Sequence, residues 1–398
     1  MPGLIDAHVH SPPRLAFGNQ ELYALLYVSY GVTSVRDVGA TEKSVRALVA
    51  RSNAERLVGP HMYWCGQVLE SPPLSFGAAR SVVTKEEGRA AVLELFREGV
   101  DCIKIYNNLA AEAYLGIREA AAEVGLPVIG HVPHLVGIAN TQDFEAQHMT
   151  GLPYFAKGEA PKNSDFRDAD WLSMTAQDID TALIAARERR FSFLPTLANG
   201  RLRLIASDPE RFPPTPGSSH MPEIWFEAWD SQTTIAAHPT GDGIALREAR
   251  LPLLSYVTGR ARELGIDVLA GTDSLMPYVV PGESLHLEIS ELAKAFGDNE
   301  AALAAATTTN GRHIDSGVIG VIAPGARADI LLLPSDPVAD LSALKDWTIL
   351  FVNGRRHDRA AIDEAVQRYD RHFHSSFYTA TMRWASRFAS SGKGRQIE

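Results

Sequence analysis

The stretch LIDAHVH, residues 4–10, is a short apolar run that carries an acid and two histidines. Such a run is typical of a buried β-strand, and here it begins almost at the start of the chain. Residues two apart in a strand point the same way, so His8 and His10 are expected to face the interior together. Two imidazoles at this spacing can bind one divalent ion, although the pair alone is weak evidence for a metal site.

Similar runs recur along the chain and alternate with stretches of helical period. The expected strands lie at residues 4–10, 32–38, 61–69, 102–106, 127–132, 144–149, 191–197 and 267–273. Residues 86–99 and 111–125 are two of the helices expected between them. A strand followed by a helix eight times predicts an α/β protein with a (β/α)8 TIM barrel. Two long connections, 150–190 and 198–265, follow late strands, where long loops often cover an active site.

The C-terminal part of the chain carries signals that do not belong to a barrel. The segments ADILLL (328–333) and WTILFVNGRR (347–356) are expected to be additional strands. Residues 360–388 have the pattern of an amphipathic helix, and residues 389–398 are expected to be frayed. The expected units are therefore a barrel over 1–315, a small β-unit over 316–358, and a helix with a tail over 359–398.

Composition excludes several classes of protein. Lys and Arg total 38 and Asp and Glu total 48 among 398 residues, which gives a formal charge of −10. This balance disfavours nucleic acids and anionic membranes as partners, because basic clusters bind phosphate groups. No apolar run approaches the roughly 20 residues of a membrane span. Only two cysteines occur, Cys65 and Cys102, so no disulfide framework is expected, which suits a reducing, cytoplasmic location for the chain as given.

Further candidate ligands lie late in the expected strands. They are Lys104 on the fourth strand, His131 on the fifth, His148 on the sixth and Asp273 on the eighth. The carboxyl ends of barrel strands meet at one mouth, where barrel enzymes keep their catalytic groups. A single buried histidine or aspartate is more often a satisfied core group. Five histidine and aspartate side chains at one mouth instead favour a metal site.

Eight motifs follow one another along the chain: PGLIDAHVH, GVTSVRD, IKIY, GHVP, QHMTG, AGTDS, AAATTTNGRHI and IGVIAPGARADILLL. In these motifs and their order the chain resembles the metal-dependent amidohydrolase superfamily, in particular its imidazolonepropionase-like and prolidase-like branch. The resemblance implies a site with two zinc ions. His8, His10 and Asp273 would hold one ion, and His131 and His148 the other. Lys104, as an N-carboxylated lysine, would bridge both ions.

The bridging role of Lys104 has a physical basis. An ammonium group beside two dications is repelled, which lowers its pKa and favours the neutral amine. The neutral amine can take up carbon dioxide and become a carbamate whose two oxygens bridge the ions. The alternatives are a mononuclear site with Lys104 as a neighbour, or a lysine that only pairs with a nearby acid. Gln147 departs from the family, which usually has an acid there, but it is expected to face away from the metals.

The resemblance also implies a mechanism, hydrolysis by a zinc-activated hydroxide. Asp273 would accept the proton of the attacking water and pass it to the leaving group. Tyr106, on the face of Lys104, and His134, after GHVP, are candidates to contact the substrate. Both have competing roles as rim or loop side chains. His220 and His238, in the connection before the eighth strand, are expected at the surface.

Three functions remain open at this point. The first is hydrolysis of an amide or peptide-like C–N bond, as in a dipeptidase or an N-acyl amino acid hydrolase. The second is hydrolysis of a cyclic amide or lactone at the same site. The third is a barrel that only binds a ligand, against which the intact ligand set argues. The sequence specifies a small or dipeptide-like substrate but not its identity, and it does not decide whether the chain forms a homo-oligomer.

The position of the first strand raises one more expectation. Relatives place several strands of a small β-sandwich before the strand with H-x-H. Met1 is therefore expected to be an internal methionine of a longer protein, so any secretion signal would lie before it and the location of the full protein stays open. The segments ADILLL and TILFV would then lack strand partners and leave backbone groups unpaired. His8 and His10 would also fray with the terminus.

Overall fold

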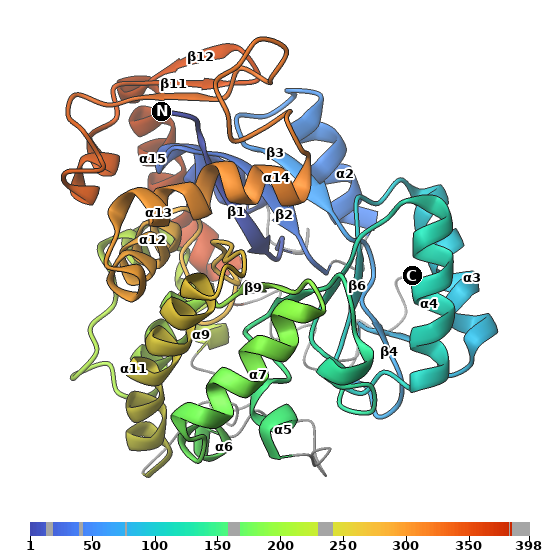
Figure 1. Ribbon diagram of the computed structural model, residues 1–398. Helices are drawn as coiled ribbons and strands as arrows, with labels where there is room; N and C mark the ends of the chain where they lie inside the picture. The colour runs from blue at the N-terminus through green and yellow to red at the C-terminus, as the bar shows by residue number, and fades with distance from the viewer. Residues whose placement is uncertain are drawn as a thin grey trace.

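A computed structural model of the protein describes residues 1–12, 19–39, 43–75, 78–157, 168–229, 242–381 and 383. Within this part of the chain, parallel strands form the centre and helices surround them (Figure 1). The predicted TIM-barrel architecture is confirmed, with antiparallel strands added near the C-terminus. No helix of the described residues combines the length and the apolar character needed to cross a membrane.

The barrel strands fall into two parallel sheets. One sheet has the order β1 (Leu4–Val9), β2 (Val32–Asp37) and β3 (His61–Trp64). The other has the order β5 (Arg80–Ser81), β4 (Leu69–Glu70), β6 (Ile103–Ile105), β7 (Val128–Gly130), β8 (Glu145–Gln147) and β9 (Ser192–Leu194). The expected strand over 61–69 is thus divided into β3 and β4. Gly66 has a φ of 68° between them, a left-handed conformation that interrupts a strand.

Two seams close the barrel. On one side, the Asp101 amide donates to the Trp64 carbonyl at 2.8 Å, which joins the end of β3 to the start of β6. On the other side, the segment 267–274 forms no continuous strand, but its backbone bonds both neighbours: the Leu269 amide donates to Phe193 of β9 at 2.8 Å, and the Ala7 amide of β1 donates to the Ala270 carbonyl at 3.1 Å. Asn310 strengthens this second seam, because its side-chain amide donates to carbonyls of both β1 and the 267–273 segment.

Helices cover the outside of the strands. The larger ones are α1 (Asn19–Ser29), α2 (Lys43–Asn53), α3 (Lys85–Glu98), α4 (Ala111–Val124), α7 (Ala176–Glu188), α11 (Asp242–Glu263) and α12 (Glu283–Phe296). Shorter turns of helix are η1 (Ile138–Asn140), α13 (Asn299–Ala304), η3 (Ala305–Thr309), α14 (Asn310–Ile314) and η4 (Leu341–Asp346). A capping box of Thr84 and Glu87 starts α3, and Gly99 in a left-handed conformation ends it.

Two glycines allow α3 and α4 to lie side by side (Figure 1). A Cβ atom on Gly88 would stand 2.4 Å from the Ala113 carbonyl oxygen of α4. A Cβ atom on Gly116 would stand 2.0 Å from the Lys85 carbonyl oxygen of α3. Because each obstacle is backbone, neither glycine accepts a side chain without separating the two helices.

The described parts of the two long connections are largely helical. Residues 150–190 contain α5 (Leu152–Lys157) and α6 (Asp168–Leu172) before α7. Residues 198–265 contain most of α8 (Leu197–Ser207), then η2 (Pro216–His220), α9 (Glu223–Trp229) and α11. His220 lies 2.9 Å from the Asp370 carboxylate near the end of the chain, so it is a tether between segments. His238 lies outside the described residues.

A small antiparallel sheet follows the barrel, with the order β10 (Ile330–Leu332), β11 (Ile349–Val352) and β12 (Arg355–Asp358). The first residues of the chain pair with its outer edge, since the Leu331 amide donates to the Met1 carbonyl at 2.9 Å. Figure 1 shows the N-terminus beside this sheet. The expectation that ADILLL and TILFV lack partners is therefore wrong, because β10 is paired on both sides and anchors the strand with His8 and His10.

The predicted C-terminal helix is interrupted. α15 (Arg359–Phe373) ends at a turn at His374, and residues 376–381 after this turn are helical again. It packs against α1, with Phe373 fully buried. The segment 389–398 lies outside the described residues. α15 therefore contributes its apolar face to the core as its pattern predicts.

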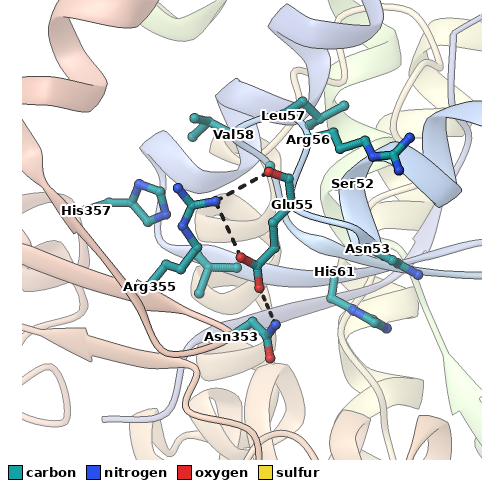
Figure 2. Close-up of a pocket in the computed structure, with 12 residues that line it drawn as sticks. Ser52, Asn53, Glu55, Arg56, Leu57, Val58, His61, Asn353, Arg355 and His357 are labelled. Atoms are coloured by element: carbon teal, nitrogen blue, oxygen red, sulfur yellow. Dashed lines mark hydrogen bonds and ion pairs between the residues drawn. The ribbon is translucent and has the colours of Figure 1, made fainter.

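A cavity of about 190 Å³ lies between the barrel and the small sheet. It lies between the turn after α2 and strands β11 and β12, and His61 and His357 face it (Figure 2). Glu55 bonds both Asn353 and Arg355 across it. His61 begins β3, so this cavity is at the amino end of the barrel strands, the end that serves stability.

One disulfide joins Cys65 to Cys102, contrary to the expectation from the cysteine count. Both residues are fully buried and cluster with Val38 and Ile129. Cys65 directly follows β3 and Cys102 directly precedes β6, so the bond lies at the first seam of the barrel. The cysteine count does not predict this bond, because two residues 37 apart in the chain meet only when the third and fourth predicted barrel strands become neighbours.

Removing this disulfide is expected to destabilise the protein. For a closed loop of this sequence separation of 37 residues, the chain-entropy model gives about 4 kcal/mol. The double variant C65A/C102A should lose this amount in denaturant unfolding, and thiol titration of the unfolded wild type should detect no free thiol. Two free thiols in the wild type, with unchanged stability in reductant, would show that the bond is absent in solution.

Candidate metal centre

Six predicted ligands come from five segments that end at the same mouth of the barrel. His8 and His10 belong to the end of β1, Lys104 to β6, and His131 and His148 follow β7 and β8 directly. Asp273 lies in the segment that bridges β9 and β1. All of these side chains are largely buried; His10 and His148, at 27% and 26%, are the most exposed. The structure therefore brings the six side chains together at the carboxyl ends of the strands, as the sequence predicts.

Asp273 is the centre of the group. One of its carboxylate oxygens lies 3.2 Å from His8 Nε2 and 3.3 Å from His10 Nε2. The other oxygen lies 3.8 Å from His148 Nε2. His8, His148 and Asp273 offer ligand atoms that all lie within 4.8 Å of one another, a spacing at which a single ion can contact all three.

His131 extends the cluster toward Lys104. Its ring centroid lies 5.0 Å from that of His148, which in turn lies 4.9 Å from that of His8. His131 Nδ1 lies 2.8 Å from Asn107 Oδ1, and His148 Nδ1 lies 2.7 Å from Thr196 Oγ1. Each contact fixes the orientation of a ring through one nitrogen and leaves the other nitrogen directed elsewhere, as is usual for metal-binding histidines.

Unusual backbone conformations bring two of the side chains inward. His148 and Asp273 have φ angles of 55° and 60°, in the left-handed region that non-glycine residues seldom adopt. Such conformations cost free energy and concentrate at functional sites. At His148 the left-handed turn ends the alternation of side chains in β8, so that His148 points to the same side as Gln147 instead of the opposite side.

Gln147 faces the interior together with His148, and the expectation that it points away from the metals is wrong. Its side-chain oxygen accepts a hydrogen bond from Lys104 Nζ, and its amide nitrogen donates to Glu145 at 3.2 Å. Glu145 also forms a buried ion pair with Arg36. Strand β8 thus points Glu145 and Gln147 inward, and the turn at His148 adds a third inward side chain.

Lys104 is fully buried beneath the mouth. Burial lowers the pKa of its amine to about 7, so a large fraction is neutral at neutral pH. The negative charges of Asp273 and Glu145 oppose this shift without reversing it. A neutral amine is the form that can react with carbon dioxide.

Most of the imidazoles are held in the neutral form that binds metals. Burial lowers the pKa of His148 to about 4 and those of His8 and His131 well below their usual value. Burial also lowers the pKa of His10, but its hydrogen bond and charge interaction with Asp273 outweigh this and raise the pKa. His8 Nδ1 is buried with no hydrogen-bond partner among the described residues. Neutral imidazoles around one carboxylate form a donor set that fits divalent zinc.

Asp273 is ionised at neutral pH. Burial alone would raise its pKa, but His8 and His10 hold the pKa well below its usual value. Asn199 Nδ2 donates to Asp273 Oδ2 at 2.8 Å and fixes the plane of the carboxylate. The group is therefore a positioned base with a defined orientation.

The two predicted substrate contacts lie beside His131 and in the loop that follows it. The ring of Tyr106 stacks on His131 with centroids 4.0 Å apart. Burial raises the pKa of the Tyr106 phenol, so the hydroxyl remains a hydrogen-bond donor at neutral pH. His134 is partly buried, its amide donates to the Asn107 carbonyl, and its ring meets Tyr154 edge to face at 5.6 Å. Tyr106 is the nearer of the two to the cluster.

Four supporting residues were not assigned a role from the sequence: Asp6, Asn107, Thr196 and Asn199. Asp6 accepts hydrogen bonds from the Thr272 amide and hydroxyl, which ties β1 to the residue before Asp273. The other three lie shortly after barrel strands and bond His131, His148 and Asp273. Polar residues just beyond the ends of strands were the available signal, but the sequence alone does not pair them with their ligands.

Comparisons with known proteins agree with this architecture. The profile of the amidohydrolase family matches residues 1–356. Bottromycin amidohydrolase is 22% identical with a TM-score of 0.71, over 94% of this chain and 80% of its own. A protein from Bifidobacterium longum described as a prolidase is 21% identical with a TM-score of 0.64, over 93% and 84%. A Xaa-Pro dipeptidase with bound methionine is 18% identical with a TM-score of 0.61, over 90% and 86%. No curated protein sequence matches the chain.

Proposed function

The chain belongs to the amidohydrolase family and is an enzyme that hydrolyses C–N bonds, and we propose that it cleaves an amide or peptide-like bond with the help of bound zinc. The reaction type is that of a dipeptidase or an N-acyl amino acid hydrolase. The observation that carries this proposal is the convergence of His8, His148 and Asp273 within 4.8 Å. The structural relatives described as a prolidase and a Xaa-Pro dipeptidase support the substrate class.

The proposed ligands divide into two sets. His8, His10 and Asp273 would hold one ion, since the Nε2 atoms of both histidines lie within 3.3 Å of the same Asp273 oxygen. His131 and His148, whose rings are adjacent, would hold the other. When bound, the ions would lower the pKa of a water molecule and polarise the scissile carbonyl.

Lys104 would join the two sets as a carbamate. Its neutral amine would form a bond to the carbon of carbon dioxide and release one proton, which leaves an anionic group with two oxygen donors. The low pKa of the buried amine favours this step. The contact of Lys104 with Gln147 places an amide where the family usually has an acid, so Gln147 would donate to or accept from the carbamate without adding charge.

Asp273 would move the proton. Its carboxylate is ionised, buried and held by Asn199, so it can accept a proton from the attacking water. It would then deliver that proton to the leaving nitrogen, because an amine leaves readily only when protonated. Tyr106, protonated and stacked on His131, would donate a hydrogen bond to the substrate at the rim of the site.

A substrate screen tests this proposal. The zinc-loaded enzyme would be assayed with linear dipeptides, N-acyl amino acids, cyclic amides and lactones. We expect turnover of at least one of the first two classes, well above that of the last two. Turnover confined to cyclic amides or lactones would instead establish the second function that the ligand set allows. No turnover of any class by fully metallated protein would contradict the proposal and favour a binding role.

A further inference from the structure

One face of helix α8 is directed at the candidate metal centre. Asn199, in the first turn, donates to Asp273 Oδ2 at 2.8 Å. Arg203 lies four residues later, and residues four apart occupy the same face of a helix. The neighbouring Arg201 points the other way, 66% exposed and paired with Glu291. The helix therefore carries one arginine on the side of the site and one on the side of the solvent.

The charge of Arg203 reaches residues of the site. Arg203 is partly buried, and its guanidinium interacts electrostatically with Tyr106 and Asp273. It also lowers the pKa of His148, as expected for a nearby positive charge. Placing a cation at the edge of a buried site has a desolvation cost that an anionic ligand would offset.

Two more arginines interact electrostatically with Arg203. Arg247 and Arg250 of α11 both bind the Asp168 carboxylate of α6, at 3.1 and 2.8 Å, and all three side chains are at most 14% exposed. Arg203 interacts electrostatically with Arg247 and with Asp168. The charge of Asp168 is already shared between two guanidinium groups, so the cluster of Arg203, Arg247, Arg250 and Asp168 carries a net positive charge.

We propose that Arg203 binds a free carboxylate of the substrate and thereby selects amides of amino acids with an unblocked carboxyl end. This inference rests on the proposed function and adds its specificity. Arginine suits the role because its planar guanidinium can bind a carboxylate through two parallel hydrogen bonds. A lactone or cyclic amide without an acidic group cannot form this ion pair. Arg203 would therefore favour linear amides of amino acids over cyclic amides and lactones.

Binding of matched ligand pairs tests the role of Arg203 without relying on turnover. The probes are N-acetyl-leucine, N-acetyl-phenylalanine and N-acetyl-proline, each with its carboxamide, titrated calorimetrically into metal-free and zinc-loaded protein. For at least one pair, the wild type should bind the acid about tenfold or more tightly than the carboxamide. The variant R203Q should lose this preference, and R203K, which keeps the charge, should retain part of it.

The variant R201Q is the matched control, because it removes an arginine from the exposed face of the same helix. It should bind all probes as the wild type does. Equal binding of acids and carboxamides by the wild type, no binding of any pair, or a preserved preference in folded R203Q would overturn the inference. If R203Q does not fold, R203K tests the inference instead. Lysine keeps the positive charge but lacks the two parallel N–H donors, so R203K should bind the acids more weakly than the wild type and the carboxamides equally well. If the wild-type enzyme binds the acids through Arg203 but hydrolyses none of the substrate classes in the screen described above, the proposed function is contradicted and the role of Arg203 in binding is not.

Discussion

Replacing Asp273 with asparagine is expected to lower turnover about 100-fold or more while the protein remains folded. Asparagine has nearly the same shape and can keep a contact with Asn199, but its amide cannot accept and deliver a proton. It also removes the negative charge that His8 and His10 surround. The measurement is kcat for D273N and wild type with zinc in excess, together with circular dichroism of both.

Asp267 provides the matched control for this variant. It lies six residues earlier on the same segment, is 44% exposed, and pairs with Arg312 and His313 on the outside of the barrel. D267N should therefore leave kcat unchanged. If D273N retained a kcat near that of the wild type, Asp273 would not be the proton carrier, and the proposed chemistry would have to use another group.

Replacing Lys104 with alanine is expected to lower metal content from about two ions per chain toward one and to reduce activity at least tenfold. The variant lacks the amine that would form the proposed bridging carbamate. Short carboxylates such as acetate should restore part of the activity, because they supply two oxygens to the same space. Wild-type protein produced without bicarbonate should be less active until bicarbonate is added.

K85A is a suitable control, since Lys85 is exposed and pairs with Glu119 on the surface. It should match the wild type in metal content and rate. Wild-type metal content and rate in K104A would instead indicate a mononuclear site formed by His8, His10, His131 and Asp273. The two results differ in the measured stoichiometry, so the assay does not depend on knowing the natural substrate.

Much of the candidate site follows from local pattern. His8 and His10 were placed by the period of a strand, and Lys104, His131 and His148 by their position at the ends of apolar runs. These features depend on neighbours in sequence, and the closed barrel turns them into neighbours in space. The eighth segment was also located, although its hydrogen bonds are too irregular to form a continuous strand.

The rest depends on contacts between distant segments or on single backbone angles. Strand β8 points Gln147 inward, and His148 also lies inward only because of its left-handed conformation, which the residue pattern does not predict. The Cys65–Cys102 bond requires two strands to become neighbours. The pairing of Met1 with Leu331 joins opposite ends of the chain, so strand propensity alone left that edge without a partner.

The amount of metal bound per chain tests the central claim most directly. Protein purified without chelator and analysed by elemental mass spectrometry should hold about two divalent ions per chain. Chelation should abolish hydrolysis, and zinc should restore it in proportion to the metal bound. Active enzyme with no stoichiometric metal would contradict the account, because His8, His10, His131, His148 and Asp273 would then have no ion to hold.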